Sequence, residues 1–433
     1  MKMSQTKKAK TAMGRSAAAA LREAEQYLLP TYKRPRVVFT HGRGSLVFDA
    51  KGKTYLDFLG GIAVNALGHA HPRIVRVVRR EAGRAIHLSN LFHNVYQGPL
   101  ARKLARWSGL ERVFFANSGT EAVDGALKLA RLFADFRKTP RSRILALDNA
   151  FHGRTFGALS VTAMEKYRRP FEPLVPGVDF VRFNDTADLE AKLDSSICAL
   201  ILETIQGEGG IHPVSEAFWN LARQLTTRYG ALLIADEIQC GLGRTGRYFA
   251  YQKFSSMPDM VLVAKPLAAG LPLGAILTTQ EVAEAVSPGL HGTTFGGGPL
   301  VCAAALEFLR TVEEEGLLKN VRARGEQLRA GIEELAGKFP VIREVRAEGL
   351  MIGVELDVEG APFVAEALRR GLLINCTHER TLRLLPPFTV TSAQVREFLR
   401  LFEMVLAKTP RVVTEPESAP AADGVCMAKA AAR

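Results

Sequence analysis

The sequence has few cysteines and no long apolar run, and each of these features excludes certain classes of protein. It contains 5 cysteines in 433 residues, an odd number without CxxC spacing, so neither a disulfide framework nor a zinc site is supported. A reducing compartment fits this cysteine usage best. No apolar run approaches the roughly 18 residues of a membrane-spanning helix, and no apolar segment of a secretory signal is present. We therefore expect neither a bound metal nor a membrane association.

Acidic residues are absent from the N-terminal stretch. The first acid is Glu23, and without the six Lys and Arg residues before it the net charge of +13 falls to +7. This distribution favours a solvated basic tail over nucleic-acid binding, because no nucleic-acid-binding module accompanies it. The tail also resembles an organellar transit peptide, but lysine outnumbers arginine and no apolar stripe is clear. We expect a cytoplasmic protein, with organellar targeting as the alternative.

Short apolar runs alternate with helical patterns from Leu100 onward. Unbroken runs of this kind are typical of strands that are buried on both faces of a parallel sheet. The alternation predicts an α/β fold with a mostly parallel sheet and helices on both faces. The strand candidates are Val113 to Ala116, Ile144 to Leu147, Ala199 to Leu202, Leu232 to Ala235, Val261 to Ala264 and Ala275 to Leu277.

The flanking segments predict further divisions of the chain. Residues 17–75 begin with a helix that Pro30 ends, continue as short strands, and are expected to join a small domain. Residues 76–304 hold the alternating pattern of the large domain, and residues 305–408 are typical of a smaller α+β domain. The basic residues 1–16 and the Pro- and Ala-rich residues 409–433 are typical of disordered tails.

Two of the apolar runs end in a charged residue, Asp236 in one case and Lys265 in the other. The carboxyl ends of parallel strands form the edge at which such sheets bind ligands. An ammonium buried there is very costly unless it has a partner or a covalent bond. Pyridoxal phosphate (PLP) needs this pair, because it forms a Schiff base with a lysine while a carboxylate holds its ring nitrogen protonated. The pair therefore predicts a PLP site.

The segment Asn117 to Glu121 follows a strand and begins a helix. Ser118 and Glu121 have the S-x-x-E spacing of a capping box, and Gly119 permits close approach to a ligand. Free N–H groups and a hydroxyl at a helix N-terminus form a phosphate site. Taken alone, an ordinary helix cap explains the segment better, but beside the Asp and Lys pair a phosphate site is favoured.

Two further loops follow apolar runs. Phe151 can stack on a flat ring, and Arg154 can bind a carboxylate bidentately. Glu203 and Glu208 lie among three glycines, which is typical of a polar loop that serves a site. The alternatives are a packed Phe with a surface Arg in the first loop and a solvated Gly-rich turn in the second.

Two patterns point to other chemistry. Residues 241–246 match G-x-G-x-x-G, but a dinucleotide-binding fingerprint lies tightly between a strand and a helix, and residues 236–240 intervene here. His69 and His71 offer two imidazoles without an evident carboxylate or Cys partner, so a structural role is favoured over metal ligation.

Together these residues resemble the class III (ornithine-type) aminotransferases of PLP fold type I. The resemblance runs from about Arg34 to Glu403 and rests on NSGTEA, FHGRT, QGEGG, DEIQCGLGRTG, AK after a strand, HGTTFGG and LRLLPP, in the family's order. It implies a seven-stranded type of sheet in a large PLP-binding domain, and a homodimer with shared active sites. Within the family, GIAVNALGHAHP and GLLINCTHERTLRLLPP look most like the members that act on N-acetylornithine.

The resemblance also implies a role for each site residue. The catalytic residues are Lys265, which forms the Schiff base, and Asp236, which pairs with the ring nitrogen. The other cofactor-binding residues are Ser118, Gly119 and Thr120 at the phosphate, Phe151 and Ile238 on the two ring faces, Gln239 at the ring hydroxyl, His152, and Thr294 at the phosphate of the neighbouring subunit. The substrate-binding residues are Arg154 for the α-carboxylate, Arg383 for a second carboxylate, Glu208 as the partner of Arg383, Glu203 and Thr293.

The implied reaction is a ping-pong transamination. It moves the distal amino group of N-acetylornithine to 2-oxoglutarate and yields N-acetylglutamate semialdehyde and glutamate, as in arginine biosynthesis. Other donors remain open: succinylornithine, ornithine, 4-aminobutyrate, succinyl-diaminopimelate or a carrier-linked lysine precursor. A PLP racemase or aminomutase could share the lysine and the phosphate site, and a nicotinamide dehydrogenase would rest on residues 241–246 alone.

Overall fold

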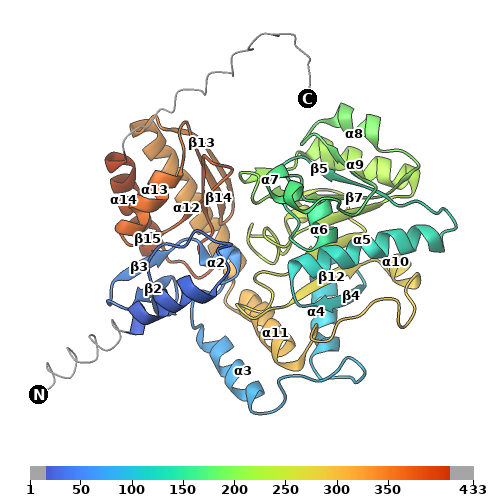
Figure 1. Ribbon diagram of the computed structural model, residues 1–433, viewed down its shortest axis with the longest axis horizontal. Helices are drawn as coiled ribbons and strands as arrows, with labels where there is room; N and C mark the ends of the chain where they lie inside the picture. Colours follow the sequence, from blue (N-terminus) through green and yellow to red (C-terminus); the bar gives the residue numbers. More distant parts are fainter. Residues whose placement is uncertain (1–15, 410–433) are drawn as a thin grey trace, which may run out of the picture.

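The computed structural model describes residues 16–409, which form two lobes joined through their core (Figure 1). The predicted tails lie outside the described residues except for residues 16 and 409. A helix over residues 16–27 opens the described chain, close to the helix expected there. No helix among residues 16–409 is both long and apolar enough to span a membrane.

The larger lobe is built on a seven-stranded sheet with the strand order β4-β12-β11-β10-β7-β5-β6. Of these strands, β12 alone runs antiparallel to its neighbours. The sheet confirms the predicted α/β fold, and all six apolar runs are strands of it. Only β6 was not predicted. The bounds are β4 Arg112–Ala116, β5 Arg143–Leu147, β6 Val178–Val181, β7 Ile197–Glu203, β10 Leu232–Asp236, β11 Met260–Val263 and β12 Gly274–Thr278.

Helices cover both faces of this sheet, as the apolar runs require. Alternate residues of β10 belong to two separate core clusters: Leu232 and Ile234 lie in the cluster of α5, and Leu233 and Ala235 in that of α9. Because successive side chains of a strand point to opposite faces, α5 and α9 cover opposite sides. The helices of this lobe are α4 Gln97–Ser108, α5 Gly119–Phe136, α6 Phe156–Ser160, α7 Glu165–Arg168, α8 Thr186–Lys192, α9 Glu216–Tyr229 and α10 Gln280–Glu284, with short 3-10 turns at Arg169–Phe171 and Ala250–Lys253.

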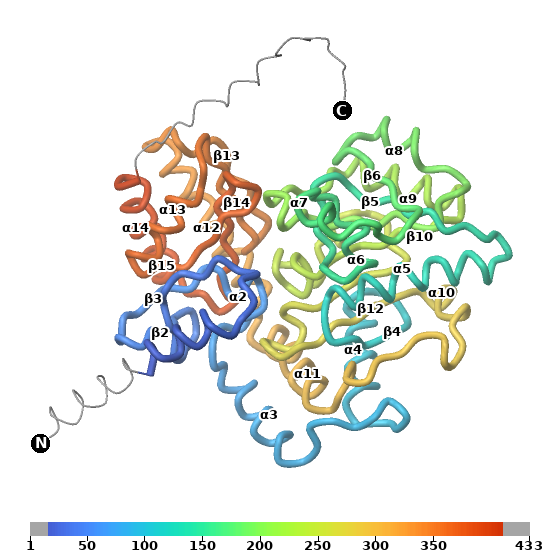
Figure 2. The backbone as a smooth tube through the Cα atoms, in the orientation of Figure 1, coloured from blue at the N-terminus to red at the C-terminus, as the bar shows by residue number. Residues whose placement is uncertain are grey.

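The smaller lobe carries two sheets. The first has the order β13-β14-β17-β16, and the second joins the N-terminal strands β1, β2 and β3 to β15. The tube view shows the N-terminal segment beside the C-terminal part of the chain (Figure 2). On this pairing we propose that residues 17–75 belong with the small domain of residues 305–408, and that residues 76–304 form the large domain. The strands are β1 Phe39–Arg43, β2 Leu46–Asp49, β3 Thr54–Asp57, β13 Ile342–Glu348, β14 Met351–Leu356, β15 Leu372–Leu373, β16 Asn375–Thr377 and β17 Thr381–Leu384.

The remaining elements connect or cover the lobes. Helix α11 packs against α3 and α4, and α12 packs against β13 and α14. The two-stranded ribbon of β8 and β9 follows β7. Their bounds are α2 Gly60–Ala63, α3 Pro72–Ala82, β8 Ile205–Gln206, β9 His212–Pro213, α11 Pro299–Glu314, α12 Leu317–Lys338, α13 Ala361–Arg369 and α14 Ser392–Lys408.

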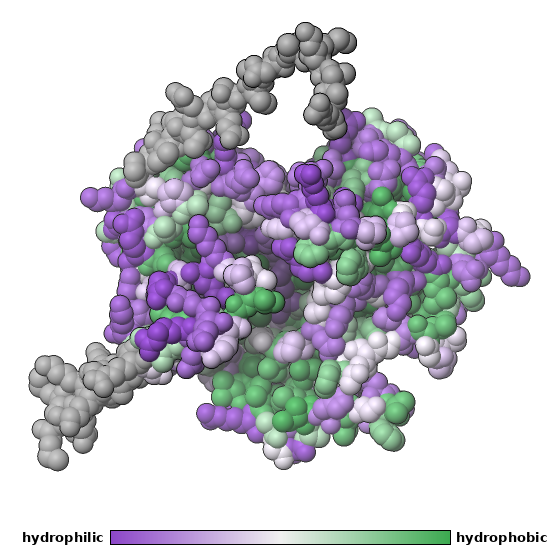
Figure 3. All heavy atoms as spheres, viewed as in Figure 1, coloured by the Kyte–Doolittle hydropathy of each residue, from purple (hydrophilic) through white to green (hydrophobic). Residues whose placement is uncertain are grey.

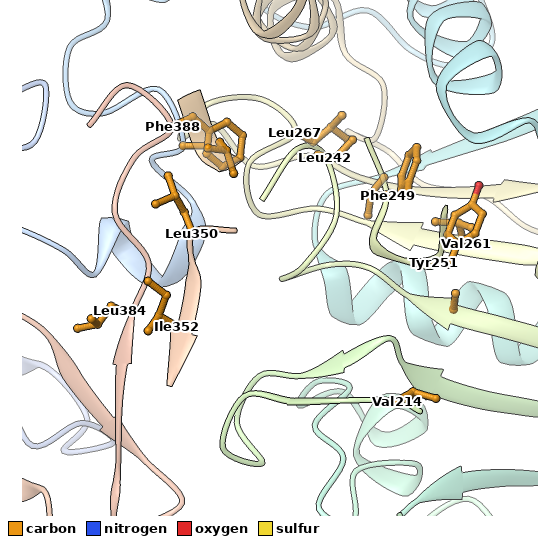
Figure 4. Packing of buried hydrophobic residues seen from close by; sticks show 14 of the residues in the cluster. Val214, Leu242, Phe249, Tyr251, Val261, Leu267, Leu350, Ile352, Leu384 and Phe388 are labelled. Carbon is orange, nitrogen blue, oxygen red and sulfur yellow. The ribbon is translucent and has the colours of Figure 1, made fainter. Parts of the chain in front are cut away.

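The largest core cluster continues from one lobe into the other. Leu242 and Leu267 of the large lobe share it with Leu350 and Phe388 of the small lobe (Figure 4). Between them the buried guanidinium of Arg244 donates hydrogen bonds to the carbonyls of Leu350 and Pro386. Residues 241–246 therefore form a loop that joins the lobes. This confirms that the segment is not the strand-to-helix turn of a dinucleotide site.

Candidate active site

A cavity of about 440 Å³ lies at the carboxyl edge of the seven-stranded sheet. Figure 3 shows a hollow between the two lobes on one face of the molecule. The cavity collects side chains from four separate strand ends and from the start of α5, so residues far apart in the chain meet there. The predicted site residues that line it are Ser118, Gly119, Thr120, Phe151, His152, Arg154, Glu203, Asp236, Ile238, Gln239 and Lys265.

Asp236 ends β10, next to Glu203 at the end of β7. One oxygen of its carboxylate, Oδ2, lies 2.7 Å from His152 Nδ1, and the other accepts a hydrogen bond from the Ile238 N–H at 3.0 Å. Both side chains are almost completely buried. These contacts fix the carboxylate at the floor of the cavity. They also leave His152 Nε2 buried without a partner among the described residues.

Lys265 follows the end of β11 and lines the same cavity. Within residues 16–409 its Nζ donates no hydrogen bond. Burial and the nearby Arg383 guanidinium lower the pKa of Lys265, and Glu208, Asp236 and Glu203 only partly oppose them. A larger fraction of this amine is therefore neutral at neutral pH than in an exposed lysine, as a nucleophile or a general base requires.

Glu203 connects two of the predicted loops. Its carboxylate accepts hydrogen bonds from the N–H groups of Phe151 at 2.9 Å and Gly207 at 2.8 Å. Burial raises the pKa of Glu203 to about 7, although His152 and these two N–H groups favour the charged form. The side chain therefore lines the cavity and also fixes the backbone of two loops, one at Phe151 and one at Gly207.

The start of α5 presents hydrogen-bond donors to the cavity. Gly119 and Thr120 are the first residues of the helix, so their N–H groups have no intrahelical acceptor. A Cβ atom on Gly119 would lie 2.8 Å from the Ile238 side chain, so a larger residue would force Ile238 to shift. The predicted capping box is wrong in one half: Ser118 Oγ accepts from the Glu121 N–H at 3.3 Å, but the Glu121 carboxylate reaches the Asn117 N–H.

Arg154 stands at the border of the cavity. Its guanidinium carbon lies 3.7 Å from the centre of the Tyr167 ring and 5.4 Å from that of Phe151. The sequence did not predict this contact of Tyr167 with Arg154, because Tyr167 follows an irregular stretch with no motif around it. Arg154 also borders a second cavity of about 430 Å³, lined further by Thr31, Tyr32, Phe156, Leu159 and Phe171.

Arg383 and Glu208 adjoin the cavity through Gln239. Arg383 Nη1 lies 2.5 Å from Glu208 Oε1 and donates to Gln239 Oε1 at 3.2 Å. Burial opposes the charge on Glu208, but the Arg383 guanidinium outweighs it and keeps the pKa of Glu208 below its usual range. Among the described residues, Arg383 Nη2 is buried without a partner. This arginine therefore has a donor left for a ligand.

Thr293 and Thr294 lie elsewhere. They line a cavity of about 980 Å³ away from Lys265. The hydroxyl of Thr293 accepts hydrogen bonds from Asn117 Nδ2 at 3.1 Å and from the Gly296 N–H at 3.3 Å. Within one chain the structure does not bring these two predicted residues into the site. The two histidines singled out in the sequence have carboxylate neighbours that the spacing did not reveal: His69 Nε2 is 2.7 Å from Asp57 Oδ2, and His71 Nε2 is 4.0 Å from Glu315 Oε1.

Comparison with known proteins places this geometry in a family. The family model of the class-III aminotransferases matches residues 28–406. The acetylornithine aminotransferase of Caldanaerobacter subterraneus subsp. tengcongensis is 43% identical over 386 residues, which is 89% of this chain and 98% of the relative.

Solved structures agree with the family match. The ornithine aminotransferase of Toxoplasma gondii superposes with a TM-score of 0.87 at 34% identity, over 90% of this chain and 95% of its own. The acetylornithine aminotransferase of Elizabethkingia anophelis gives 0.81 at 30% identity, over 90% and 99%. The chain therefore belongs to the class-III aminotransferases, a family of PLP-dependent enzymes.

Proposed function

We propose that this enzyme moves the distal amino group of N-acetylornithine to 2-oxoglutarate, producing N-acetylglutamate semialdehyde and glutamate for arginine biosynthesis. One observation carries the proposal: Lys265, Asp236 and Arg154 line one cavity, and Arg383 adjoins it through its hydrogen bond to Gln239. Two cations near the same cavity suit a reaction whose acceptor is a dicarboxylate. Relatives named acetylornithine aminotransferase, 42 to 43% identical over 89% of the chain, support the choice of donor.

The residues present fit PLP. Asp236 offers a buried carboxylate, the start of α5 offers free N–H groups, and the lack of a Cβ on Gly119 leaves space beside Ile238. When bound, PLP supplies a protonated ring that takes up the electrons of the substrate carbanion. The residues that would hold it are Lys265, Asp236, His152, Ser118, Gly119, Thr120, Phe151, Ile238 and Gln239.

Lys265 has two tasks in this proposal. Its Nζ would hold the cofactor covalently at rest. During turnover the freed amine would act first as a general base that takes a proton from the substrate carbon, and then as a general acid that gives this proton to the bound cofactor. Its lowered pKa supports the first proton transfer, because the amine must be neutral to accept a proton. The Asp236 carboxylate is fixed by His152 and the Ile238 N–H, and it would stabilise the positive charge on the protonated ring nitrogen of PLP.

The two arginines divide the recognition of carboxylates. The donor carries its reacting amine far from its α-carboxylate, so Arg154 at the cavity border binds that distant end. Arg383 binds the second carboxylate of 2-oxoglutarate. While the donor is bound, Glu208 neutralises Arg383, and it releases Arg383 when the dicarboxylate enters. The 2.5 Å pair and the unpartnered Nη2 of Arg383 support this exchange.

We also propose a homodimer in the cytoplasm. The loop after α3 exposes Ile86, Leu91, Phe92 and Val95, a concentration of apolar surface that marks an interaction site in soluble proteins. Apolar side chains gather on the same part of the surface, near α3 and α11 (Figure 3). The adjacent cavity holds Thr293 and Thr294, so a second copy seated there would receive Thr294 at its phosphate site.

A donor panel tests the function. Purified holoenzyme is mixed with 2-oxoglutarate and each donor in turn, and glutamate is measured. N-acetylornithine should give the highest kcat/KM, and a Lys265→Ala variant should give none. Ornithine is the second candidate, because ornithine aminotransferases are among the similar structures. A higher kcat/KM for ornithine, or interconversion of amino acids without 2-oxoglutarate, would contradict the proposal.

A further inference from the structure

Tyr167 of α7 lies against the guanidinium of Arg154. We propose that Tyr167 is a positioning residue that holds Arg154 ready for the α-carboxylate of the substrate. The inference rests on the proposed function, in which Arg154 binds that carboxylate. It adds the means by which an exposed arginine on a loop keeps one orientation.

The geometry is that of one guanidinium packed against two aromatic rings. The guanidinium carbon of Arg154 lies 3.7 Å from the Tyr167 ring centre, which is van der Waals contact, and 5.4 Å from that of Phe151. The rings of Tyr167 and Phe151 are 6.0 Å apart and meet edge-on at 82°. A cation within about 6 Å of a ring centre is attracted by the quadrupole of the ring. Two rings in perpendicular planes therefore restrict the guanidinium from two directions.

The N–H groups of the guanidinium remain available. Among residues 16–409, no oxygen or nitrogen accepts a hydrogen bond from the Arg154 side chain; only its backbone N–H is bonded, to Thr120 Oγ1 at 3.1 Å. An aromatic ring contacts the face of a guanidinium, whereas a carboxylate binds its N–H edge. The contact with Tyr167 therefore orders Arg154 without occupying the donors that the substrate needs.

Ordering matters because Arg154 is exposed. A long side chain that is free in solution loses rotamer freedom each time it binds a ligand, and that loss weakens binding. Tyr167 itself does not line the Lys265 cavity. Its hydroxyl makes no hydrogen bond to a described residue, so the ring face is the part that acts. An effect of Tyr167 that depends on the α-carboxylate is thus expected to pass through Arg154, whereas an effect through Phe151, which lies edge-on to the same ring, would fall on all donors alike.

Two donors that differ only in the α-carboxylate test the proposal. N-acetylputrescine is N-acetylornithine without that group. The kcat/KM of the PLP-loaded enzyme is measured for both donors in the first half-reaction. Tyr167→Leu should lower the value for N-acetylornithine about five- to tenfold, mainly through KM, and leave that for N-acetylputrescine unchanged. Tyr167→Phe keeps the ring face and should match the unmodified enzyme.

A double-mutant cycle shows whether Tyr167 acts through Arg154. In an Arg154→Leu background, Tyr167→Leu should cause no further loss. Arg168→Leu, which removes a stack on Phe180 from the same helix, is the matched control and should keep the donor ratio. Equal losses with both donors, additive losses in the cycle, or a defective Tyr167→Phe enzyme would overturn the inference. If the unmodified enzyme itself shows no preference for N-acetylornithine over N-acetylputrescine, the role of Arg154 in the proposed function fails instead.

Discussion

The pair of Arg383 and Glu208 makes a quantitative prediction about donor discrimination. Glu208→Gln keeps the shape of the side chain and removes its charge, so Arg383, which is fully buried, loses its counterion. A free Arg383 then attracts the second carboxylate of glutamate when glutamate enters as the donor. Hydrogen bonds to charged groups contribute about 1.5–3 kcal/mol, so we take about 2 kcal/mol, which is roughly 30-fold in an equilibrium constant.

The assay compares two half-reactions of the PLP-loaded enzyme. The kcat/KM ratio of N-acetylornithine to glutamate should fall roughly 30-fold in Glu208→Gln. Glu344→Gln removes an equally negative but exposed partner of Arg346 in the small lobe, and it should leave the ratio unchanged. Thermal unfolding of both variants checks that the fold is retained. A ratio within about twofold of the original in Glu208→Gln would refute the exchange of partners by Arg383.

Three further predictions concern the cofactor site. Gly119→Ala places a methyl group 2.8 Å from Ile238 and should raise the Kd for PLP at least tenfold, whereas Gly337→Ala, which meets nothing within 4 Å, should not change it in equilibrium dialysis. Asp236→Asn should lower kcat roughly 100- to 1000-fold in steady-state turnover while the PLP absorbance is retained, because the protonated ring nitrogen of PLP would lose its carboxylate partner. The rate of proton abstraction should rise with pH through a pKa below the ordinary lysine value of 10.5, because Lys265 is active only when its amine is neutral. A pH–rate profile that rises only at or above that value would contradict the lowered pKa.

Much of the fold and the floor of the site could be predicted because their signals are local. Strands β7 and β10 are buried at every residue, so their apolar runs are unbroken and end visibly at Glu203 and Asp236. The segment that begins α5 also has a local signal, because the end of a strand and the start of a helix follow each other directly in the sequence. The structure brings residues with such short-range patterns together around one cavity.

The features that escaped prediction depend on three-dimensional geometry that the spacing of residues in the sequence does not encode. Tyr167 meets Arg154 only because α7 folds back over the loop that carries Arg154. The carboxylate of Glu121 accepts a hydrogen bond from the Asn117 N–H and not from the Ser118 N–H, a difference of one residue that the S-x-x-E spacing does not encode. Thr294 lies outside the cavity of its own chain, so its predicted role depends on a second copy.

The most direct test of the central claim is the change of cofactor form in the first half-reaction. PLP-loaded enzyme is mixed with N-acetylornithine, without 2-oxoglutarate, in a stopped-flow spectrometer. We expect one turnover to the pyridoxamine form, with N-acetylglutamate semialdehyde released in equal amount, a kcat/KM above that of every other donor in the panel, and no conversion in Lys265→Ala. Conversion that is faster with ornithine or 4-aminobutyrate, or that persists in Lys265→Ala, would contradict this expectation.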